Sequence, residues 1–206
     1  MTSDRPIAGD IAQHPAGEPP RRMGAQGSQT WQTLVAAAET LLIEQGYAAV
    51  TARRVAETAN LSPQIVYFYF KNMDELFAAL FRKISDAFLE ALATVTDQPA
   101  PLTALWELAS DPKGAVLFSE LISLSNHRPS IRLMISEFGK EQNRLQTEII
   151  AAHLERVGLD RDAYPAQVIA SLIENLGKGL ALGDRFEIES HSRARGFVSE
   201  FLKGIG

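Results

Sequence analysis

Gln64, at the start of a short helix, is the side chain of this chain best suited to recognise a base. It lies in the segment 50–76, where one short helix ends near Asn60 and Ser62 caps a second short helix after a tight turn. Two such helices form a helix-turn-helix, whose second helix presents its first side chains to the major groove of DNA. A glutamine there can bond to both N6 and N7 of adenine. The segment therefore predicts contact with DNA, against the plainer alternative of a solvent-exposed glutamine.

Capping residues mark the helices that would position this glutamine. Four polar residues stand where helix N-caps are expected: Ser28, Thr51, Ser62 and Asn72. Pro63 follows at the first helical position, a preferred pairing, and Gly46 ends the first helix as a C′ glycine does. Apolar residues recur at helical spacing in the first helix and, from Leu76 to Leu92, in the fourth.

The rest of the chain also has a helical pattern. Helices are expected at about 101–110, 113–126, 129–157, 163–183 and 190–204, and no alternating strand pattern is present. The fold class is therefore all-α. Residues 1–27 contain four prolines and four glycines without any period, which predicts a flexible N-terminal arm. Its Arg21-Arg22 pair suits DNA phosphates, although a solvated tail is the plainer interpretation.

Charge is distributed unevenly along the chain. The formal net charge is −5, whereas a simple nucleic-acid binder is usually basic. Residues 21–73, however, carry five basic and three acidic residues, so the acid lies elsewhere. A weakly positive end on an acidic body fits a protein that binds DNA at one end only.

Catalysis, cofactors and membrane insertion are not expected. The chain has no cysteine, its four histidines are far apart, and it contains no GxSxG, phosphate-loop or HExxH motif. We therefore expect no enzyme activity, no metal and no cofactor. The apolar runs are too short to span a bilayer, and the N-terminus lacks the order of a secretory signal. A cytoplasmic location is expected.

From about Gln29 to Arg82 the chain resembles the TetR family of transcriptional repressors (TetR/AcrR type). The matching features, in order, are Gly46-Tyr47, Thr51 with Val55-Ala56, Asn60-Leu61-Ser62, Tyr67-Phe68-Tyr69-Phe70, and Lys71 before Asn72 with Asp74-Glu75-Leu76. The family often has glycine at the positions of Asn60 and Gln64. Asparagine tolerates the left-handed conformation, so the turn is expected to survive. Gln64 adds a base-reading side chain, which makes an unusual operator the expectation.

The resemblance implies an architecture and a function. A three-helix DNA-binding domain, residues 28–88, would be joined by its fourth helix to a ligand-binding and dimerisation domain, residues 89–206. The protein would be a dimeric repressor that binds a pseudo-palindromic double-stranded operator and is released by a small, largely apolar effector. Two alternatives remain at this point. One is a protein-interaction module with a vestigial DNA end, and the other is a ligand-independent or activating regulator of the same fold.

Ten residues are expected to contact DNA. Tyr67 and Lys71 match positions that hold phosphate in the family, and Thr51 and the two arginines of the preceding helix are suited to phosphate as well. Pro63 and Ile65 suit apolar contact with a thymine methyl group, while Val66 and Phe70 are expected to pack inward. The full set is Thr51, Arg53, Arg54, Ser62, Pro63, Gln64, Ile65, Tyr67, Phe68 and Lys71.

Candidate ligand contacts in the C-terminal half are polar residues on apolar helix faces and nearby large apolar residues. Gln142 interrupts the stripe from Phe138 to Leu145, and Asn175 lies beside Leu172 and Leu176. Buried amides need partners, which a ligand or other side chains can provide. The full set is Trp106, Phe118, His127, Met134, Phe138, Gln142 and Asn175. For each apolar residue in this set, packing in the core is the plainer interpretation.

The last two helices are the candidate dimer interface. Small residues between Leu176 and Gly183 allow close helix approach, and Phe197, Val198, Phe201 and Leu202 recur at helical spacing. Two such helices from each of two copies would form a four-helix interface. A core formed within one chain is the alternative, and the family resemblance favours the dimer.

Overall fold

The computed structural model describes residues 24–160 and 162–205, and within them it is helical without any strand. The α-helices are α1 (Gln29–Gln45), α2 (Ala52–Thr58), α3 (Pro63–Tyr69), α4 (Met73–Val95), α5 (Pro101–Ala109), α6 (Pro112–Ser125), α7 (Pro129–Arg156), α8 (Ala166–Leu182) and α9 (Glu189–Ile205). Two short 3-10 helices, η1 (Tyr47–Ala49) and η2 (Gly183–Phe186), follow α1 and α8. The all-α expectation is confirmed. The proposed arm, including Arg21-Arg22, lies outside the described residues except for its last four positions.

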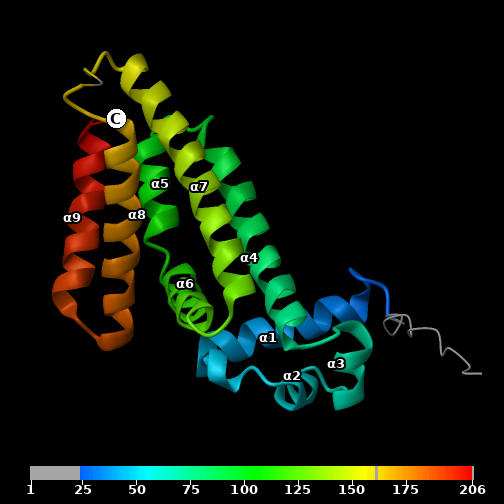
Figure 1. Cartoon of the computed structure of the whole chain (residues 1–206). Helices are drawn as coiled ribbons and strands as arrows, with labels where there is room; N and C mark the ends of the chain where they lie inside the picture. The colour runs from blue at the N-terminus through cyan, green and yellow to red at the C-terminus, as the bar shows by residue number, and fades with distance from the viewer. Residues whose placement is uncertain (1–23, 161, 206) are drawn as a thin grey trace, which may run out of the picture.

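The helices form two connected groups (Figure 1). Helices α1, α2 and α3 gather at one end, and α4 and α7 run side by side away from it. Helices α8 and α9 pair at the far side of the body, and α8 packs on α5, α6 and α7. Helix α4 therefore belongs to both groups, and α6 lies between the α1 end and α8.

Three of the four expected N-caps bond their helices as predicted. The side chains of Ser28 and Thr51 accept hydrogen bonds from backbone N–H groups three residues on, each at 3.4 Å. Asn72 Oδ1 accepts from the N–H of Glu75 at 3.0 Å. Ser62 stands at the N-cap in an extended conformation without a side-chain bond, with Pro63 following it. Helix α8 begins three residues later than expected because Pro165 disfavours helix at the residue before it.

Asn60 makes the turn between α2 and α3. Its φ is +55°, the left-handed conformation expected of this position. The N–H of Leu61 donates to the carbonyl of Ala56 at 2.8 Å, and the N–H of Asn60 donates to Glu57 at 3.1 Å. These two bonds form a Schellman motif, which closes α2 and turns the chain into α3. The family-like turn therefore survives without a glycine.

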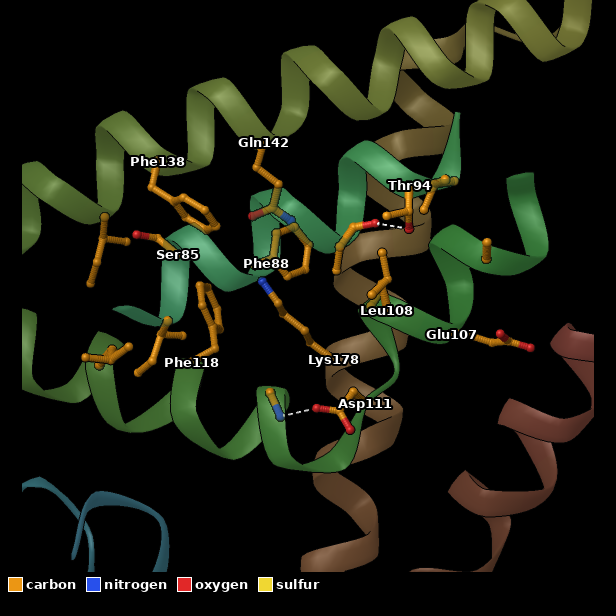
Figure 2. Close-up of a pocket in the computed structure, with 18 of the residues that line it drawn as sticks. Ser85, Phe88, Thr94, Glu107, Leu108, Asp111, Phe118, Phe138, Gln142 and Lys178 are labelled. Atoms are coloured by element: carbon orange, nitrogen blue, oxygen red, sulfur yellow. Dashed lines mark hydrogen bonds between the residues drawn. The ribbon is translucent and has the colours of Figure 1, made fainter. Parts of the chain in front are cut away.

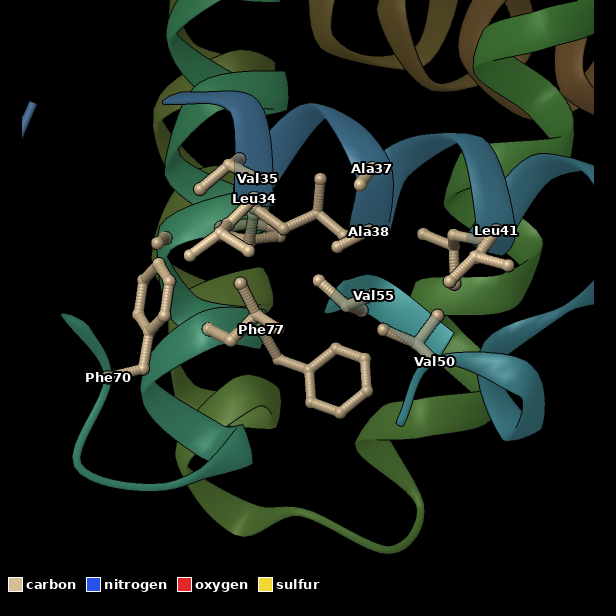
Figure 3. Close-up of a cluster of buried hydrophobic side chains, with 14 of the residues drawn as sticks. Leu34, Val35, Ala37, Ala38, Leu41, Val50, Val55, Phe70 and Phe77 are labelled. Carbon is tan, nitrogen blue, oxygen red and sulfur yellow. The ribbon is translucent and has the colours of Figure 1, made fainter. Parts of the chain in front are cut away.

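The apolar core consists of two clusters. The first joins α1, α2, α3 and the start of α4, with Leu34, Val55 and Phe77 at its centre (Figure 3). It continues into Leu117 and Leu121 of α6. The second joins the end of α4 with α5, α7, α8 and Leu202 of α9. The first cluster therefore ties the helix-turn-helix to the body, because α6 contributes to it directly.

Candidate nucleic-acid interface and binding pocket

Helix α3 has one buried face and one open face. Val66 and Phe70 are 1% and 2% exposed and anchor the helix in the first core cluster, as expected. Gln64 is exposed, and Tyr67 on the next turn is 60% exposed. Of the ten residues expected to contact DNA, the structure leaves these open to solvent: Thr51, Arg53, Ser62, Pro63, Gln64, Tyr67 and Lys71. The open face of α3 thus carries amide and hydroxyl groups, and Lys71 just after the helix adds an ammonium group.

The other three candidates are partly buried. Ile65 packs against the first core cluster. Phe68 lies edge-on to Tyr69, with ring centroids 5.1 Å apart, so its ring already has a packing partner. Arg54 donates to the side chain of Gln45 at the end of α1. On the open side, Arg53 pairs with Glu57 at 2.8 Å, an exposed pair that a phosphate can replace.

A cavity of about 400 Å³ lies in the helical body between α4, α5, α6 and α7, with one side chain from α8 (Figure 2). Its lining residues on α4 and the segment after it are Phe81, Ile84, Ser85, Phe88, Ala91, Thr94, Val95 and Gln98. The other helices and caps contribute Ala104, Glu107, Leu108, Ala109, Asp111, Gly114, Phe118, Leu121, Ile135, Phe138, Gln142 and Lys178. The wall is mostly apolar, with few polar groups, as is usual for small-molecule sites.

Two polar side chains meet inside this apolar wall. Gln142 is 5% exposed, and its Nε2 has no hydrogen-bond partner within the described residues. The Lys178 ammonium lies 3.6 Å from the centroid of the Phe118 ring and forms an ion pair with Glu174 one turn earlier. Figure 2 shows the end of Lys178 directed between Phe118 and Phe88, toward Gln142. The cavity therefore holds a donor that the chain leaves unused.

Three of the seven sequence candidates for ligand contact line this cavity: Phe118, Phe138 and Gln142. The other four do not line it, which corrects the expectation. Trp106 is 2% exposed in the second core cluster, and Met134 packs against the first. His127 is exposed and stacks on Tyr47, with ring centroids 6.2 Å apart. Asn175 is exposed, and its amide donates to the carbonyl of Ser171 at 2.8 Å.

The error at Asn175 has a clear physical cause. Its apolar neighbours Leu172 and Leu176 are 54% and 50% exposed, so the stripe they form on α8 faces outward. The opposite side of α8 packs inward, where Gly177 lies so close that an added Cβ would be 2.8 Å from the Cβ of Ala109. Lys178, which the sequence reasoning missed, follows from this rotation of the helix. Its one signal was a cation between two glycines, Gly177 and Gly179.

Helix α6 connects the cavity to the DNA-binding end. Its residues Gly114, Phe118 and Leu121 line the cavity. On its other side, Lys113 pairs with Glu39 of α1 at 2.9 Å, and Glu120 accepts a hydrogen bond from the N–H of Tyr47 at 2.9 Å. A change of cavity shape that moves α6 therefore also moves its contacts with α1 and η1.

Two further charged contacts join the same regions. Glu39 also binds Lys83 of α4 at 2.7 Å. Burial opposes ionisation of Glu39, but the hydrogen bonds from Lys83 and Lys113 outweigh it and lower the pKa of this carboxyl. At the start of α7, Arg128 pairs with Asp74 and lies 5.0 Å from the centroid of the Phe77 ring.

Helices α8 and α9 each expose large apolar side chains. Val168, Leu172 and Leu176 recur every four residues on α8, each at least 50% exposed. On α9, Phe197 and Phe201 are 72% and 58% exposed and stack on each other, with ring centroids 6.4 Å apart. We call these five residues the α8–α9 apolar face. Monomeric proteins rarely expose large contiguous apolar patches.

The fold and the open face of α3 define a helix-turn-helix DNA-binding protein. Residues 34–80 match the model of the bacterial regulatory proteins of the tetR family. The chain is also 27% identical, over 153 residues, to the HTH-type transcriptional regulator TcmR of Streptomyces glaucescens, covering 69% of this chain and 67% of TcmR. Residues 34–80 therefore form a DNA-binding domain of the TetR type, and the chain as a whole is similar to transcriptional regulators of that family.

Solved structures share the fold across most of the chain. A TetR transcription regulator from Haloarcula marismortui matches with a TM-score of 0.68 at 22% identity, covering 85% of this chain and 97% of that one. FadR from Bacillus subtilis, solved with stearoyl-CoA, matches with a TM-score of 0.63 at 18% identity, covering 84% and 97%. The helical body therefore follows the family fold beyond the segment that the family model covers.

Two features are absent from residues 24–160 and 162–205. No helix there is long and apolar enough to cross a membrane. No cluster of three or more histidine, aspartate or glutamate side chains there is arranged to hold a metal ion.

Proposed function

We propose that this protein is a ligand-responsive repressor, which binds a pseudo-palindromic operator as a homodimer and is released by a small, largely apolar effector. The observation that carries the proposal is that one chain combines an open recognition helix with an apolar cavity, and that α4 and α6 line the cavity and also contribute to the core cluster that anchors the recognition helix. Such a regulator acts on chromosomal DNA, so we also propose a cytoplasmic location.

The proposed DNA contacts divide into two kinds. Gln64 reads a base edge, with Pro63 and Ile65 beside it for apolar contact in the major groove. The hydroxyl groups of Thr51, Ser62 and Tyr67 and the cations Arg53, Arg54 and Lys71 hold phosphates, which set the position of α3 in the groove. Phe68 supports this surface through its contact with Tyr69.

The proposed dimer forms through the α8–α9 apolar face. A second copy would cover this face and complete a four-helix interface. Gly179 lies on the same side of α8, and an added Cβ there would meet nothing within 4 Å in this chain. A helix-interior glycine destabilises a helix, so its presence supports close approach of a partner helix. A two-fold dimer places two recognition helices about 34–36 Å apart, or a multiple of that distance.

The proposed release works through movement of α4 and α6. The DNA-binding domain, residues 28–88, and the ligand-binding and dimerisation domain, residues 89–206, both contribute to the first core cluster, so a movement in one is passed to the other. A ligand that widens the cavity displaces α6 from Tyr47 and Glu39 and changes the separation of the two recognition helices. By linkage, the ligand weakens DNA binding by the same factor as DNA weakens ligand binding.

Binding to DNA from upstream of the chain's own coding region tests the proposal. Fluorescence anisotropy should show saturable binding whose affinity falls steeply with salt, because each phosphate contact releases counterions. Random-site selection should return a sequence with two-fold symmetry. Selection without any enriched sequence would contradict the proposed repressor, and an enriched site without symmetry would contradict the dimeric arrangement.

A further inference from the structure

The polar groups inside the cavity specify more than an apolar ligand. The Gln142 amide is more than nine-tenths buried, yet its Nε2 lacks a hydrogen-bond partner within the described residues. A buried donor without an acceptor is unfavourable, so natural proteins rarely keep one without a reason. Because Gln142 lines the cavity, the acceptor that satisfies its N–H groups has to come from the contents of the cavity.

The charges around the cavity favour an uncharged occupant. The Lys178 ammonium is already neutralised by its ion pair with Glu174, whose other oxygen accepts a hydrogen bond from Gln146 at 3.1 Å. The remaining charged lining groups are the carboxylates of Glu107 and Asp111. Both of these residues are exposed to solvent. A carboxylate ligand would lose its hydration against the apolar wall without an unpaired cation to compensate. A neutral acceptor can still take a free N–H of Lys178.

The apolar part of the wall is rich in aromatic rings. Phe138 packs edge-on to both Phe81 and Phe88, with ring centroids 5.8 Å apart in each pair, and Phe118 adds a fourth ring. Aromatic rings prefer such edge and offset contacts with other aromatic rings. The lining follows α4 from Phe81 to Val95, which corresponds to about 21 Å of helix. The space is therefore elongated, with Gln142 and Lys178 between its two ends.

We propose that the cavity binds an uncharged, elongated aromatic molecule whose carbonyl oxygen, near the middle of the molecule, accepts hydrogen bonds from Lys178 and Gln142. This inference rests on the proposed function in one respect, namely that the cavity is the effector site. It adds the chemical class of the effector and the two residues that recognise its polar group.

Three probes of matched shape test the class of ligand. They are 4-benzoylbiphenyl, which has a central carbonyl, 4-benzylbiphenyl, which has a methylene in its place, and 4′-benzoylbiphenyl-4-carboxylate. Isothermal titration calorimetry on the full chain without DNA should show about tenfold tighter binding of the ketone than of the methylene compound, the effect expected of gained hydrogen bonds. The carboxylate should bind at least about tenfold more weakly than the uncharged ketone.

Three variants test the residues. Gln142→Leu removes the amide, and the double change of Glu174→Met with Lys178→Met removes the ion pair as a unit. Each should reduce the preference for the ketone over the methylene compound to about threefold or less, because one donor is lost. The control is Thr103→Val, which removes a buried hydroxyl that also lacks a hydrogen-bond partner within the described residues and does not line the cavity. It should leave the preference unchanged, even if the protein becomes less stable.

The outcomes separate this inference from the proposed function. Equal binding of the ketone and the methylene compound would contradict carbonyl recognition and leave an apolar effector site intact. Tightest binding of the carboxylate would overturn the assignment of an uncharged ligand. Absence of binding by all three probes would reject the class, while DNA binding and dimerisation are measured separately and would stand.

Discussion

Gln64 and Lys71 offer DNA two kinds of contact, and their substitution should have distinct effects. Lys71→Ala should weaken binding to all DNA sequences alike. It should also reduce the slope of log K against log salt concentration by about 1, because one phosphate contact is lost. Gln64→Ala should instead relax the preference at one base position, by about 1–3 kcal/mol. Anisotropy titrations against an operator and its single-base variants measure both. If the two variants behave identically, the division into phosphate and base contacts is wrong.

His153, near the end of α7, should make stability depend on pH. It is 1% exposed; burial lowers its pKa, and nearby Arg156 lowers it further. Below about pH 6.5 the unfolded chain therefore binds a proton at His153 more readily than the folded chain does. The free energy of unfolding should consequently fall as the pH decreases below about 6.5. Urea denaturation between pH 7.5 and 5 measures this slope.

Two variants identify the source of this pH dependence. His153→Leu should flatten the slope because the titrating group is gone. Arg156→Gln should reduce it partly, because one of the two causes of the lowered pKa is removed. A slope that His153→Leu leaves intact would assign the pH dependence to another group.

At the scale of the elements, two faces of α6 make contacts that matter for the proposed function. One face lines the cavity with Gly114, Phe118 and Leu121, and the other contacts α1 and η1 through Lys113 and Glu120. Sequence periodicity predicted this helix and its boundaries to within one residue. It could not show that both faces are occupied, because α6 meets α1 and α8 only once the chain has folded back on itself.

Glu39 joins α1 to α4 and α6, so its loss should cost more than the loss of an ordinary surface charge. Glu39→Gln should lower the free energy of unfolding by about 1–2 kcal/mol, since two charge-assisted hydrogen bonds on a half-buried carboxylate are lost. Its lowered pKa means that the contribution is present above about pH 4.5 and is lost as pH falls below it. Chemical denaturation at pH 7 and at pH 4 measures both effects.

The matched control for Glu39 is Glu57, which pairs with Arg53 on the surface at 2.8 Å. Glu57→Gln should change the free energy of unfolding much less than Glu39→Gln does, as is usual for exposed pairs. Equal effects of the two substitutions would show that Glu39 does not join the three helices energetically.

At the scale of the whole molecule, the α8–α9 apolar face should control assembly. Phe197→Glu together with Phe201→Glu should convert a dimer into a monomer, because charges cannot be buried unpaired in an interface. Loss of the dimer should weaken operator binding at least about a hundredfold, since the two half-sites would no longer be bound together. Analytical ultracentrifugation and anisotropy measure the two effects.

Leu133→Glu is the control for this double variant. Leu133 is 66% exposed on α7 and is not one of the five residues of the α8–α9 apolar face, so the substitution should leave mass and affinity unchanged. A wild-type protein that sediments as a monomer at micromolar concentration would contradict the proposed assembly.

The amino-acid sequence alone determined the local features of this protein. The caps at Ser28, Thr51 and Asn72, the left-handed turn at Asn60 and the buried face of α3 were all predicted, because each depends on residues within one or two turns. Only the tertiary structure decided which apolar faces meet. It placed Lys178 and Gln142 in one cavity and turned Asn175 with Leu172 to the outside. Helical periodicity shows that a face is apolar, but only the packing of distant helices shows what covers it.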